Sequence, residues 1–172
     1  REQSAADHEA YFKEQLGDVV EPTAPFNVLN VQGDAGLVAE TRMGLSDAHA
    51  ARIRECSKEQ GVTPAVLFHL AWAQVLARCS GRDDVVFGTV LSGRLQGSEG
   101  ADQVVGMFIN TLPIRIPLRN ANVRDAVRDT YQRLSKLLVR EQAPLALAQR
   151  CSGVAPSQPL FTALLNYRHS KS

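Results

Sequence analysis

The spacing of apolar residues predicts a helix at the start of the chain and a loop after it. Between Ser4 and Leu16 apolar residues recur at helical spacing, and Gly17 follows the last of them. Residues 18–36 contain prolines, glycines and asparagines with no sustained period, which predicts a loop. We therefore expect a short amphipathic helix and then a linker between two lobes.

The next stretch changes from a strand pattern to helix patterns. Leu37 to Leu45 alternates and carries Val and Thr, which predicts a strand. Ser46 can cap a helix over Asp47 to Glu59. A Thr-Pro pair then opens an almost wholly apolar helix from Pro64 to Cys79. Because apolar side chains cover most of its circumference, we expect this helix to be buried on most sides.

Two further strands and a long helix complete the pattern. Asp84 to Leu91 is rich in β-branched residues and predicts a buried strand. Phe108 to Leu118 alternates around Pro113, which predicts a strand with proline at a bend or an edge. Asn122 caps a helix to about Arg140. The apolar stripe of this helix comprises Val123, Val127, Tyr131, Leu134 and Leu138.

A last strand is expected from Leu160 to Arg168. Helices and strands thus alternate along the chain, and this order predicts an α/β or layered α+β fold, with helices packed on one face of a sheet. The sequence stops soon after the last apolar strand, where a compact domain rarely ends. We therefore expect the chain to be a truncated piece of a larger protein.

Composition excludes several classes of partner. The chain has 172 residues, with 19 Lys and Arg against 18 Asp and Glu. Because no basic run builds the field that phosphate backbones require, nucleic acid is not an expected partner. No apolar run reaches the ~20 residues of a bilayer span, so no membrane contact is expected. The first residues lack the apolar core of a secretory signal, which predicts a cytoplasmic location.

Local catalytic and metal motifs are absent from the sequence. The three cysteines show no CxxC spacing, so we expect reduced thiols and no zinc site. None of the four histidines has a partner at HxxxD or HExxH spacing. His69 lies inside the apolar helix and is expected to be a core histidine, whereas a site role stays open for His169.

The sequence also lacks the motifs of a serine nucleophile, a paired-carboxylate site and a phosphate-binding loop. Ser92 follows a strand but lacks the surrounding Gly-x-Ser-x-Gly turn. Asp83 and Asp84 are adjacent, and neighbouring side chains on a strand point to opposite faces, so we expect a turn before a strand and no paired-carboxylate site. The glycines fit no phosphate-binding pattern.

Four ordered segments are more specific than any of these local motifs. Phe68–Arg78, Asp83–Arg94, Val105–Arg115 and Pro159–Tyr167 closely resemble consecutive motifs of nonribosomal peptide synthetase condensation domains. At 141–147, where that family often has His-Gln-Asp-x-Pro-Phe-Glu, this chain reads Glu-Gln-Ala-Pro-Leu-Ala-Leu. The family's His-His-x-x-x-Asp-Gly motif belongs to an N-terminal lobe, and the sequence does not contain it.

The resemblance implies one lobe of a fold similar to chloramphenicol acetyltransferase, with a mixed sheet. It divides the chain into a helix and interlobe linker over 1–36 and a partial C-terminal lobe over 37–172. In this family, donor and acceptor carrier proteins bring phosphopantetheine-linked acyl groups into a tunnel between two lobes, where an amine attacks a thioester. The implied partners are the N-terminal lobe, the carrier proteins and adjacent synthetase modules. No directly bound cofactor, no metal and no catalytic residue are expected within this chain.

The same resemblance places Asn166 beside the tunnel and Ser92-Gly93-Arg94 on the segment that crosses toward the other lobe. Asn166 either orients the amide-forming groups or ends the hydrogen bonds of a sheet, and Arg94 makes an interlobe contact or touches substrate. Asn110 and Thr111 are expected to hydrogen-bond within the sheet.

The resemblance leaves the subtype of the domain open. We expect the chain alone to be inactive and to expose apolar surface where the other lobe packs. Two alternatives remain: a relative that epimerises or cyclises its substrate, and a non-catalytic module that interacts with carrier proteins.

Overall fold

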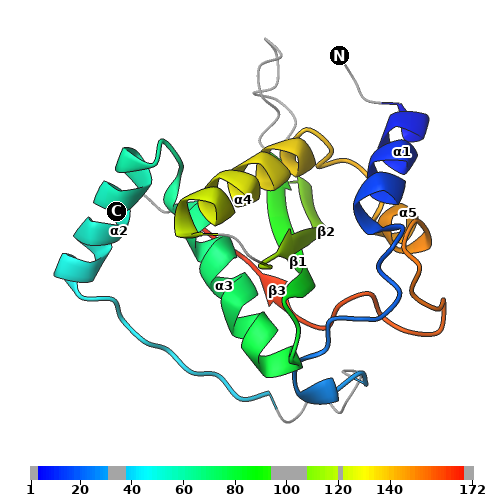
Figure 1. The fold of residues 1–172 in the computed structure, drawn as a ribbon, viewed down its shortest axis with the longest axis horizontal. Coiled ribbons are helices and arrows are strands. Elements are labelled where there is room, and N and C mark those ends of the chain that lie inside the picture. Colours follow the sequence, from blue (N-terminus) through cyan, green and yellow to red (C-terminus); the bar gives the residue numbers. More distant parts are fainter. Residues whose placement is uncertain (1–3, 31–37, 94–107, 120–121, 169–172) are drawn as a thin grey trace.

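A computed structural model describes residues 4–30, 38–93, 108–119 and 122–168. Their elements are, in chain order, α1 (Ala5–Leu16), the 3-10 turn η1 (Pro25–Asn27), α2 (Asp47–Glu59), α3 (Pro64–Ser80), β1 (Asp84–Gly93), β2 (Phe108–Pro117), α4 (Val123–Leu138), α5 (Leu145–Arg150) and β3 (Leu164–Leu165) (Figure 1).

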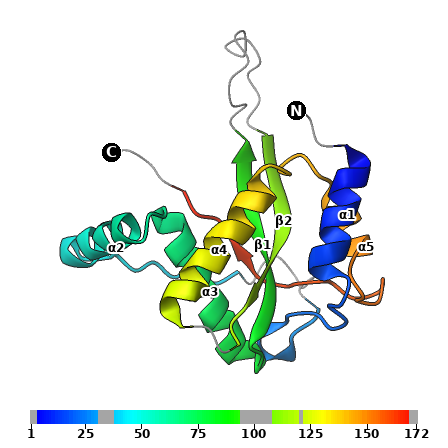
Figure 2. The same cartoon turned by 45° about the horizontal axis from the view of Figure 1, so that its top comes forward.

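The strands form a mixed three-stranded sheet in the order β2-β1-β3. β1 and β2 pair antiparallel over their whole length, from Asp84 opposite Pro117 to Gly93 opposite Phe108, and stand side by side in Figure 2. β3 is short and runs parallel to β1, with Leu164 opposite Gly88. Among the described strands β2 lies at an edge, where a proline such as Pro113 costs no sheet hydrogen bond.

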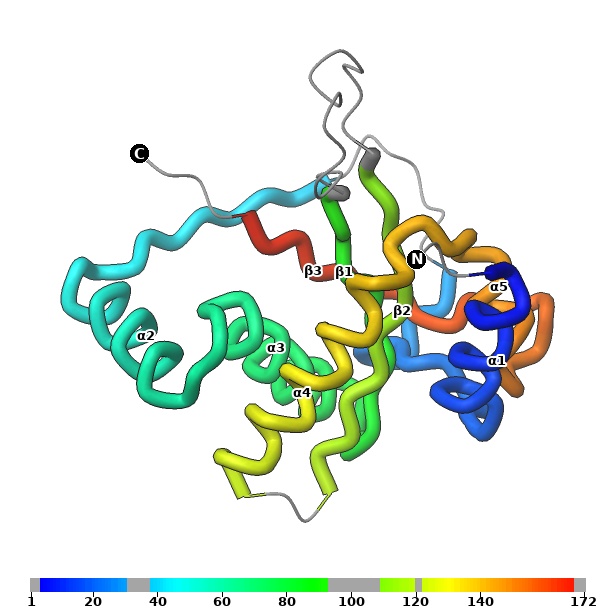
Figure 3. Tube along the Cα trace, turned by 90° about the horizontal axis from the view of Figure 1, so that it is seen from above, coloured from blue at the N-terminus to red at the C-terminus, as the bar shows by residue number. Residues whose placement is uncertain are grey.

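Helices α3 and α4 pack against each other and cross the sheet, while α1 and α5 pack together beside β2 (Figure 3). Helix α2 projects away from the rest of the fold and contacts α3 (Figures 1 and 3). The predicted class, a layered α+β fold with a mixed sheet, is therefore confirmed.

Side-chain caps explain where three of the helices begin. The Ser4 hydroxyl accepts from the Asp7 amide while the Asp7 carboxylate accepts from the Ser4 amide, which forms a capping box on α1. Ser46 caps α2, as predicted, and the Asn122 side chain caps α4 by accepting from the Asp125 amide. Each cap satisfies a backbone donor that the first helical turn leaves unpaired.

The core lies around β1. Val85, Val86 and Phe87 are almost completely buried, which confirms the predicted buried strand and shows apolar contact on both of its faces. Gly88 continues this strand, and a β-carbon there would lie 2.3 Å from a methyl carbon of Leu164. The close approach of the β3 segment therefore requires a residue without a side chain.

The strand predicted at Leu37 to Leu45 is wrong for the described residues. Residues 38–46 are extended but carry no secondary structure, and all of them are exposed. A strand needs a neighbouring backbone to pair with, and no described segment lies beside this one. The expected last strand from Leu160 to Arg168 is likewise reduced to β3 and one isolated bridge between Thr23 and Phe161.

The burial of α4 differs from the predicted apolar stripe. On α4 the buried side chains are Val127, Thr130, Leu134 and Leu137. Tyr131 and Leu138 are exposed because, at 100° per residue, they lie about 60–80° from the centre of that buried side. Val123 is exposed in the first turn of the helix.

On α3 the exposed residues at 71, 74, 75 and 78 form one stripe, and the other positions of the helix are buried or half-buried. The prediction that this helix is buried on most sides is therefore confirmed. The exposed stripe includes Val75, a large apolar side chain, because a helix buries only the sides that meet a packing partner.

Candidate functional site

Two of the predicted site segments meet at one end of the sheet. Ser92 lies near the carboxyl end of β1, opposite Ile109, and Gly93 ends the strand. Asn166 directly follows β3, which runs parallel to β1, and the carboxyl ends of parallel strands lie at the same edge. If the register of β3 with β1 is continued by one residue, Asn166 stands beside Val90. Val90 lies two residues before Ser92, which is about 7 Å along β1. Arg94 lies outside the described residues.

Asn110 joins a third segment to this end of the sheet. It lies on β2 opposite Leu91. Its Nδ2 donates to the backbone carbonyls of Glu141 and Ala143, at 2.7 Å each, and its Oδ1 accepts from the Thr111 amide. The expectation that Asn110 bonds within the sheet holds for its Oδ1, which bonds Thr111 of the same strand, whereas its Nδ2 bonds the turn between α4 and α5.

The sequence contained a signal for this contact that the strand pattern concealed. Asparagine is uncommon in strands because its amide competes for backbone groups, and Asn110 interrupts an otherwise apolar run. The turn it holds is the segment at 141–147 that departs from the family pattern. Ala143 in this turn is fully buried, so its carbonyl needs a protein partner.

The side chains of Ser92, Asn110 and Asn166 at this end of the sheet are uncharged. Ser92 and Asn166 are both exposed, and their hydroxyl and amide groups can donate and accept hydrogen bonds. Neither can act as a general base near neutral pH. Within the described residues no cluster of His, Cys, Asp and Glu could hold a metal ion. The side chains of Ser92 and Asn166 can orient a substrate but cannot take its proton.

His69 is a core residue, as the sequence predicted. Its ring is 3% exposed. Nδ1 lies 2.6 Å from the Ala65 carbonyl and must donate to it, so the neutral ring accepts at Nε2 from the Thr89 hydroxyl at 2.8 Å. Burial lowers the pKa of His69 below its ordinary value. Both ring nitrogens are satisfied in the neutral form, which leaves no free group for catalysis. His169 lies outside the described residues.

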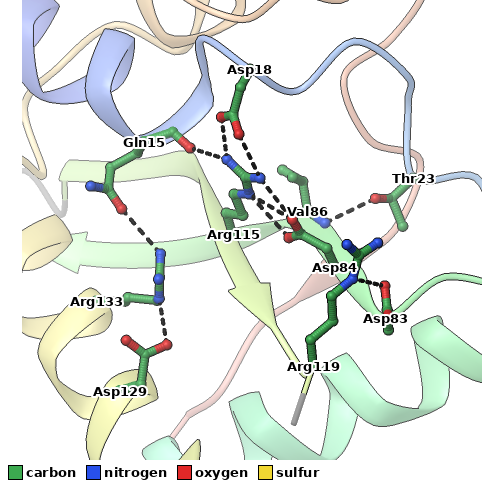
Figure 4. Close-up of polar contacts among 10 residues, drawn as sticks. All are labelled: Gln15, Asp18, Thr23, Asp83, Asp84, Val86, Arg115, Arg119, Asp129 and Arg133. Atoms are coloured by element: carbon green, nitrogen blue, oxygen red, sulfur yellow. Dashed lines mark hydrogen bonds and ion pairs between the residues drawn. The ribbon is translucent and has the colours of Figure 1, made fainter. Parts of the chain in front are cut away.

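Charged residues gather at the opposite end of the sheet (Figure 4). The Arg115 guanidinium donates to the Asp84 carboxylate at 2.7 Å, to Asp18 at 2.5 Å and to the Gln15 carbonyl at 3.0 Å. The hydrogen bonds that Arg115 donates to Asp84 and Asp18 raise the pKa of Arg115, and the bond donated to Asp18 lowers the pKa of the Asp18 carboxyl. This guanidinium ties α1 to β1 and β2.

The two adjacent aspartates have different partners, as expected for a structural role. Asp84 pairs with Arg115, whereas Asp83 accepts from Arg119 at 2.7 Å. Nearby, the Thr23 hydroxyl accepts from the Val86 amide at 2.9 Å and so satisfies a buried donor of β1. The contacts at this end of the sheet hold α1 and the loop after it against β1 and β2. The candidate site is the other end, which carries Ser92 and Asn166.

One hollow in the described surface lies away from both ends of the sheet. It measures about 1100 Å³ and is open to solvent, between α5 and the following loop at 152–160. Its lining is mainly neutral, with Arg150 as a charged contributor. None of the predicted site residues lines it.

The described fold is a mixed sheet with helices packed against it, and Ser92, Asn110 and Asn166 lie at one end of that sheet. Over residues 1–171 the chain matches the condensation domain family. It is 50% identical over 163 residues to malpinin synthetase of Mortierella alpina, a match that covers 95% of this chain and 2% of that protein. The chain therefore belongs to the condensation domain family of nonribosomal peptide synthetases.

Solved structures agree with this fold. The X-domain from teicoplanin biosynthesis matches with a TM-score of 0.69 at 19% identity, covering 95% of this chain and 37% of that chain. The EpoB NRPS cyclization-docking bidomain from Sorangium cellulosum matches with a TM-score of 0.65 at 18% identity, covering 96% and 35%. At these identities the likeness concerns the fold alone.

The structure also bears on the cysteines and on membrane-spanning helices. The cysteines Cys56, Cys79 and Cys151 are free thiols, and Cys151 is buried. In the described part of the chain no single helix is long and apolar enough to cross a membrane. The pair α2 and α3 passes by length and composition only when taken together, and it is bent by 105°.

Proposed function

We propose that this chain is part of the C-terminal lobe of a condensation domain that forms amide bonds between carrier-bound aminoacyl or peptidyl thioesters. The acceptor amine attacks the thioester carbonyl, the C–N bond forms, the C–S bond breaks, and the phosphopantetheine sulfur of the donor carrier leaves as a thiolate, which takes up the proton that the amine gives to the base. The proton of the amine passes to a base on the N-terminal lobe. This chain supplies tunnel wall and hydrogen bonds, and it is inactive alone in this proposal.

The observation that carries the proposal is the group of polar side chains Ser92, Asn110 and Asn166 at one end of the sheet. Ser92 and Asn166 come from separate strands to the same edge, and Asn110 anchors the neighbouring turn. An amide N–H aimed at the attacked carbonyl stabilises the negative charge that develops on its oxygen. The absent base agrees with the 35–37% share of the matched chains that this chain covers, which leaves room for a lobe that carries one.

The proposal includes the partners that such a reaction requires. Carrier proteins present the phosphopantetheine arms, so this chain binds no cofactor of its own, and the partner lobe, carriers and adjacent modules belong to one cytoplasmic synthetase. Ser92, Gly93 and Arg94 form the segment that faces the other lobe, and Asn166 faces the tunnel.

A variant at Asn166 in the complete condensation domain tests this role. Amide formation from two carrier-bound aminoacyl thioesters is followed by mass spectrometry of the products. Loss of one donor to a developing oxyanion lowers the rate on the order of 10²-fold, so Asn166→Ala has this effect at unchanged thermal stability. Asn166→Asp also fails because a carboxylate does not donate.

Gln132→Ala, on the exposed outer side of α4, is the matched control and keeps the full rate. A rate for Asn166→Ala within twofold of the natural domain contradicts the tunnel role and leaves Asn166 as a residue that ends sheet hydrogen bonds. The product also separates the alternatives: a heterocycle indicates a cyclising relative, an inverted stereocentre an epimerising one, and no product at all a carrier-interaction module.

A further inference from the structure

The two faces of the sheet differ in how far they are covered. On the face that meets α3, the Thr89 side chain bonds to His69 of that helix. This cover continues toward the carboxyl end of β1, where Leu91 is 5% exposed, and Leu112 on β2 is 0% exposed. Packing against helices therefore seals this face as far as Leu91.

The opposite face opens to solvent toward the carboxyl end of β1. Alternate residues of a strand share a face, and on this face β1 is buried at Gly88, half-buried at Val90 and exposed at Ser92. Ile109 and Leu164 are 52% and 54% exposed, so large apolar side chains meet solvent there. The strand pairing places these residues of β2 and β3 on the open part of the face: Thr111, Ile109 and Leu164.

Apolar groups form the floor of this open face. Gly88 has no side chain, and carbon atoms of three other side chains occupy the space where its β-carbon would stand. They belong to Leu164, Phe161 and Thr111. The described strand residues on this part of the face carry no charge. A charged group placed there would lose its water without gaining a partner, which costs free energy.

The candidate site borders the same open face. With the register of β3 continued by one residue, Asn166 stands beside Val90 and two residues after Leu164. In the proposed reaction, Asn166 donates to the carbonyl oxygen of the donor thioester. The donor side chain is attached to the carbon atom next to that carbonyl, so it lies over the residues that surround Asn166 on this face.

We propose that Leu164 and Val90 form a subsite for the side chain of the donor aminoacyl group, and that this subsite selects apolar side chains. The inference rests on the proposed function, because the role of Asn166 fixes where the donor carbonyl lies. An apolar donor side chain buries the exposed part of Leu164 and gains free energy from leaving water. A polar or charged one finds no partner on the strand residues of this face.

Competition between two donors of similar shape tests the subsite. The complete condensation domain receives one acceptor carrier and an equimolar mixture of leucyl and asparaginyl donor carriers, and mass spectrometry gives the ratio of the two amide products. The two side chains are nearly equal in size, so this ratio reports their polarity. The leucyl product is favoured at least about tenfold. Equal products, or a preference for the asparaginyl donor, overturn the proposal.

Substitutions at Leu164 change which donor is preferred. Leu164→Lys places a cation in the subsite and raises the product from an aspartyl donor, relative to the leucyl donor, at least about tenfold. Leu164→Asn keeps the size of the side chain and lowers the leucyl preference, which provides the test if the lysine variant does not fold. Val75→Lys is the matched control, because Val75 is 47% exposed on the outer side of α3, and it leaves the ratio unchanged. Equal shifts in Leu164→Lys and Val75→Lys contradict the subsite.

Two outcomes would assign the selection elsewhere. Arg168 is exposed two residues after Asn166, and a natural domain that prefers an aspartyl donor overturns the proposal, because a cation then selects the side chain. The same competition between two acceptors, with the donor fixed, gives the same product ratio in the natural domain and in Leu164→Lys. A shift for the acceptors alone overturns the assignment to the donor.

The subsite and the proposed function fail independently. A complete domain that forms amides without any donor preference refutes the subsite alone. A domain that forms no amide refutes the proposed function. The subsite is then measured by the binding of carriers whose leucyl or asparaginyl group is joined through an unreactive amide. Equal affinity for these two carriers refutes it, and tighter binding of the leucyl carrier that is lost in Leu164→Asn supports it.

Discussion

Gly88 is the position where the packing of the sheet is most sensitive to one added carbon. An ideal β-carbon there would lie 2.3 Å from Leu164 Cδ2, 2.7 Å from Phe161 Cε2 and 2.9 Å from Thr111 Cγ2. Carbon atoms in contact are normally about 3.5–4.0 Å apart, so three neighbours must move. Overpacking of a core costs about 1–3 kcal/mol, and the crowding from three sides puts Gly88→Ala at about 3 kcal/mol.

Urea unfolding followed by circular dichroism measures this loss as a lower midpoint at unchanged slope. Gly44→Ala is the matched control, because a β-carbon at Gly44 has nothing within 4 Å, and its stability stays within about 0.5 kcal/mol. Leu164→Ala removes the nearest clashing atom, so the double variant Gly88→Ala/Leu164→Ala is less destabilised than the sum of the two single changes. A Gly88→Ala chain as stable as the Gly44→Ala chain refutes the packing described for β1 and β3.

Three further substitutions test the other contacts. Asn110→Ala leaves the carbonyl of the buried Ala143 unpaired and costs about 1–3 kcal/mol in urea unfolding, with faster amide exchange at 139–144; an unchanged midpoint refutes the anchoring. Burial lowers the pKa of His69 in the folded chain below the ordinary histidine value of about 6.5. As the pH falls below about 6.5 the unfolded chain therefore binds the proton before the folded chain does, and the free energy of unfolding declines with further acidification. His69→Gln weakens that decline, and an identical pH profile contradicts it. Arg115→Met leaves Asp84 without its ion-pair partner and lowers the free energy of unfolding by about 1–3 kcal/mol, with partial exposure allowed for. Arg119→Met breaks an exposed pair and changes it by no more than about 0.5 kcal/mol. Equal losses in the two variants contradict the prediction that the Arg115 pair contributes more.

Local patterns were sufficient where a residue's role depends on its chain neighbours. Ser46 and Asn122 cap helices because the cap is satisfied within one turn. The buried strand at β1 follows from its run of mostly β-branched and large apolar residues from Val85 to Leu91. His69 in an apolar helix is a core residue because such a helix must bury a side somewhere.

Patterns failed where the role depends on a segment distant in the sequence. Leu37 to Leu45 has a strand's alternation, but pairing needs a partner that the described chain does not place there. The side of α4 that is buried depends on where α3 and the sheet lie, so Tyr131 and Leu138 were misplaced. Asn110 was assigned to the sheet because its partners at 141–143 lie far along the chain.

The candidate site itself was only partly accessible from sequence. The family resemblance selected Ser92 and Asn166, and the parallel pairing of β3 with β1 brings them to one edge. No local residue pattern predicts that Ser92 and Asn166 lie at the same end of the sheet, because β1 and β3 are far apart in the sequence. What the chain does at that edge stays a proposal.

The most direct test of that proposal compares the isolated chain with the complete condensation domain in the same amide-forming assay. Both proteins receive the same carrier-bound donor and acceptor thioesters, and the product is measured by mass spectrometry. We predict amide product with the complete domain and none above background with the 172-residue chain. Replacing Asn166 by Ala in the complete domain greatly lowers the rate of product formation. Turnover by the isolated chain that disappears on changing His69 contradicts the account, because the base would then lie in this lobe.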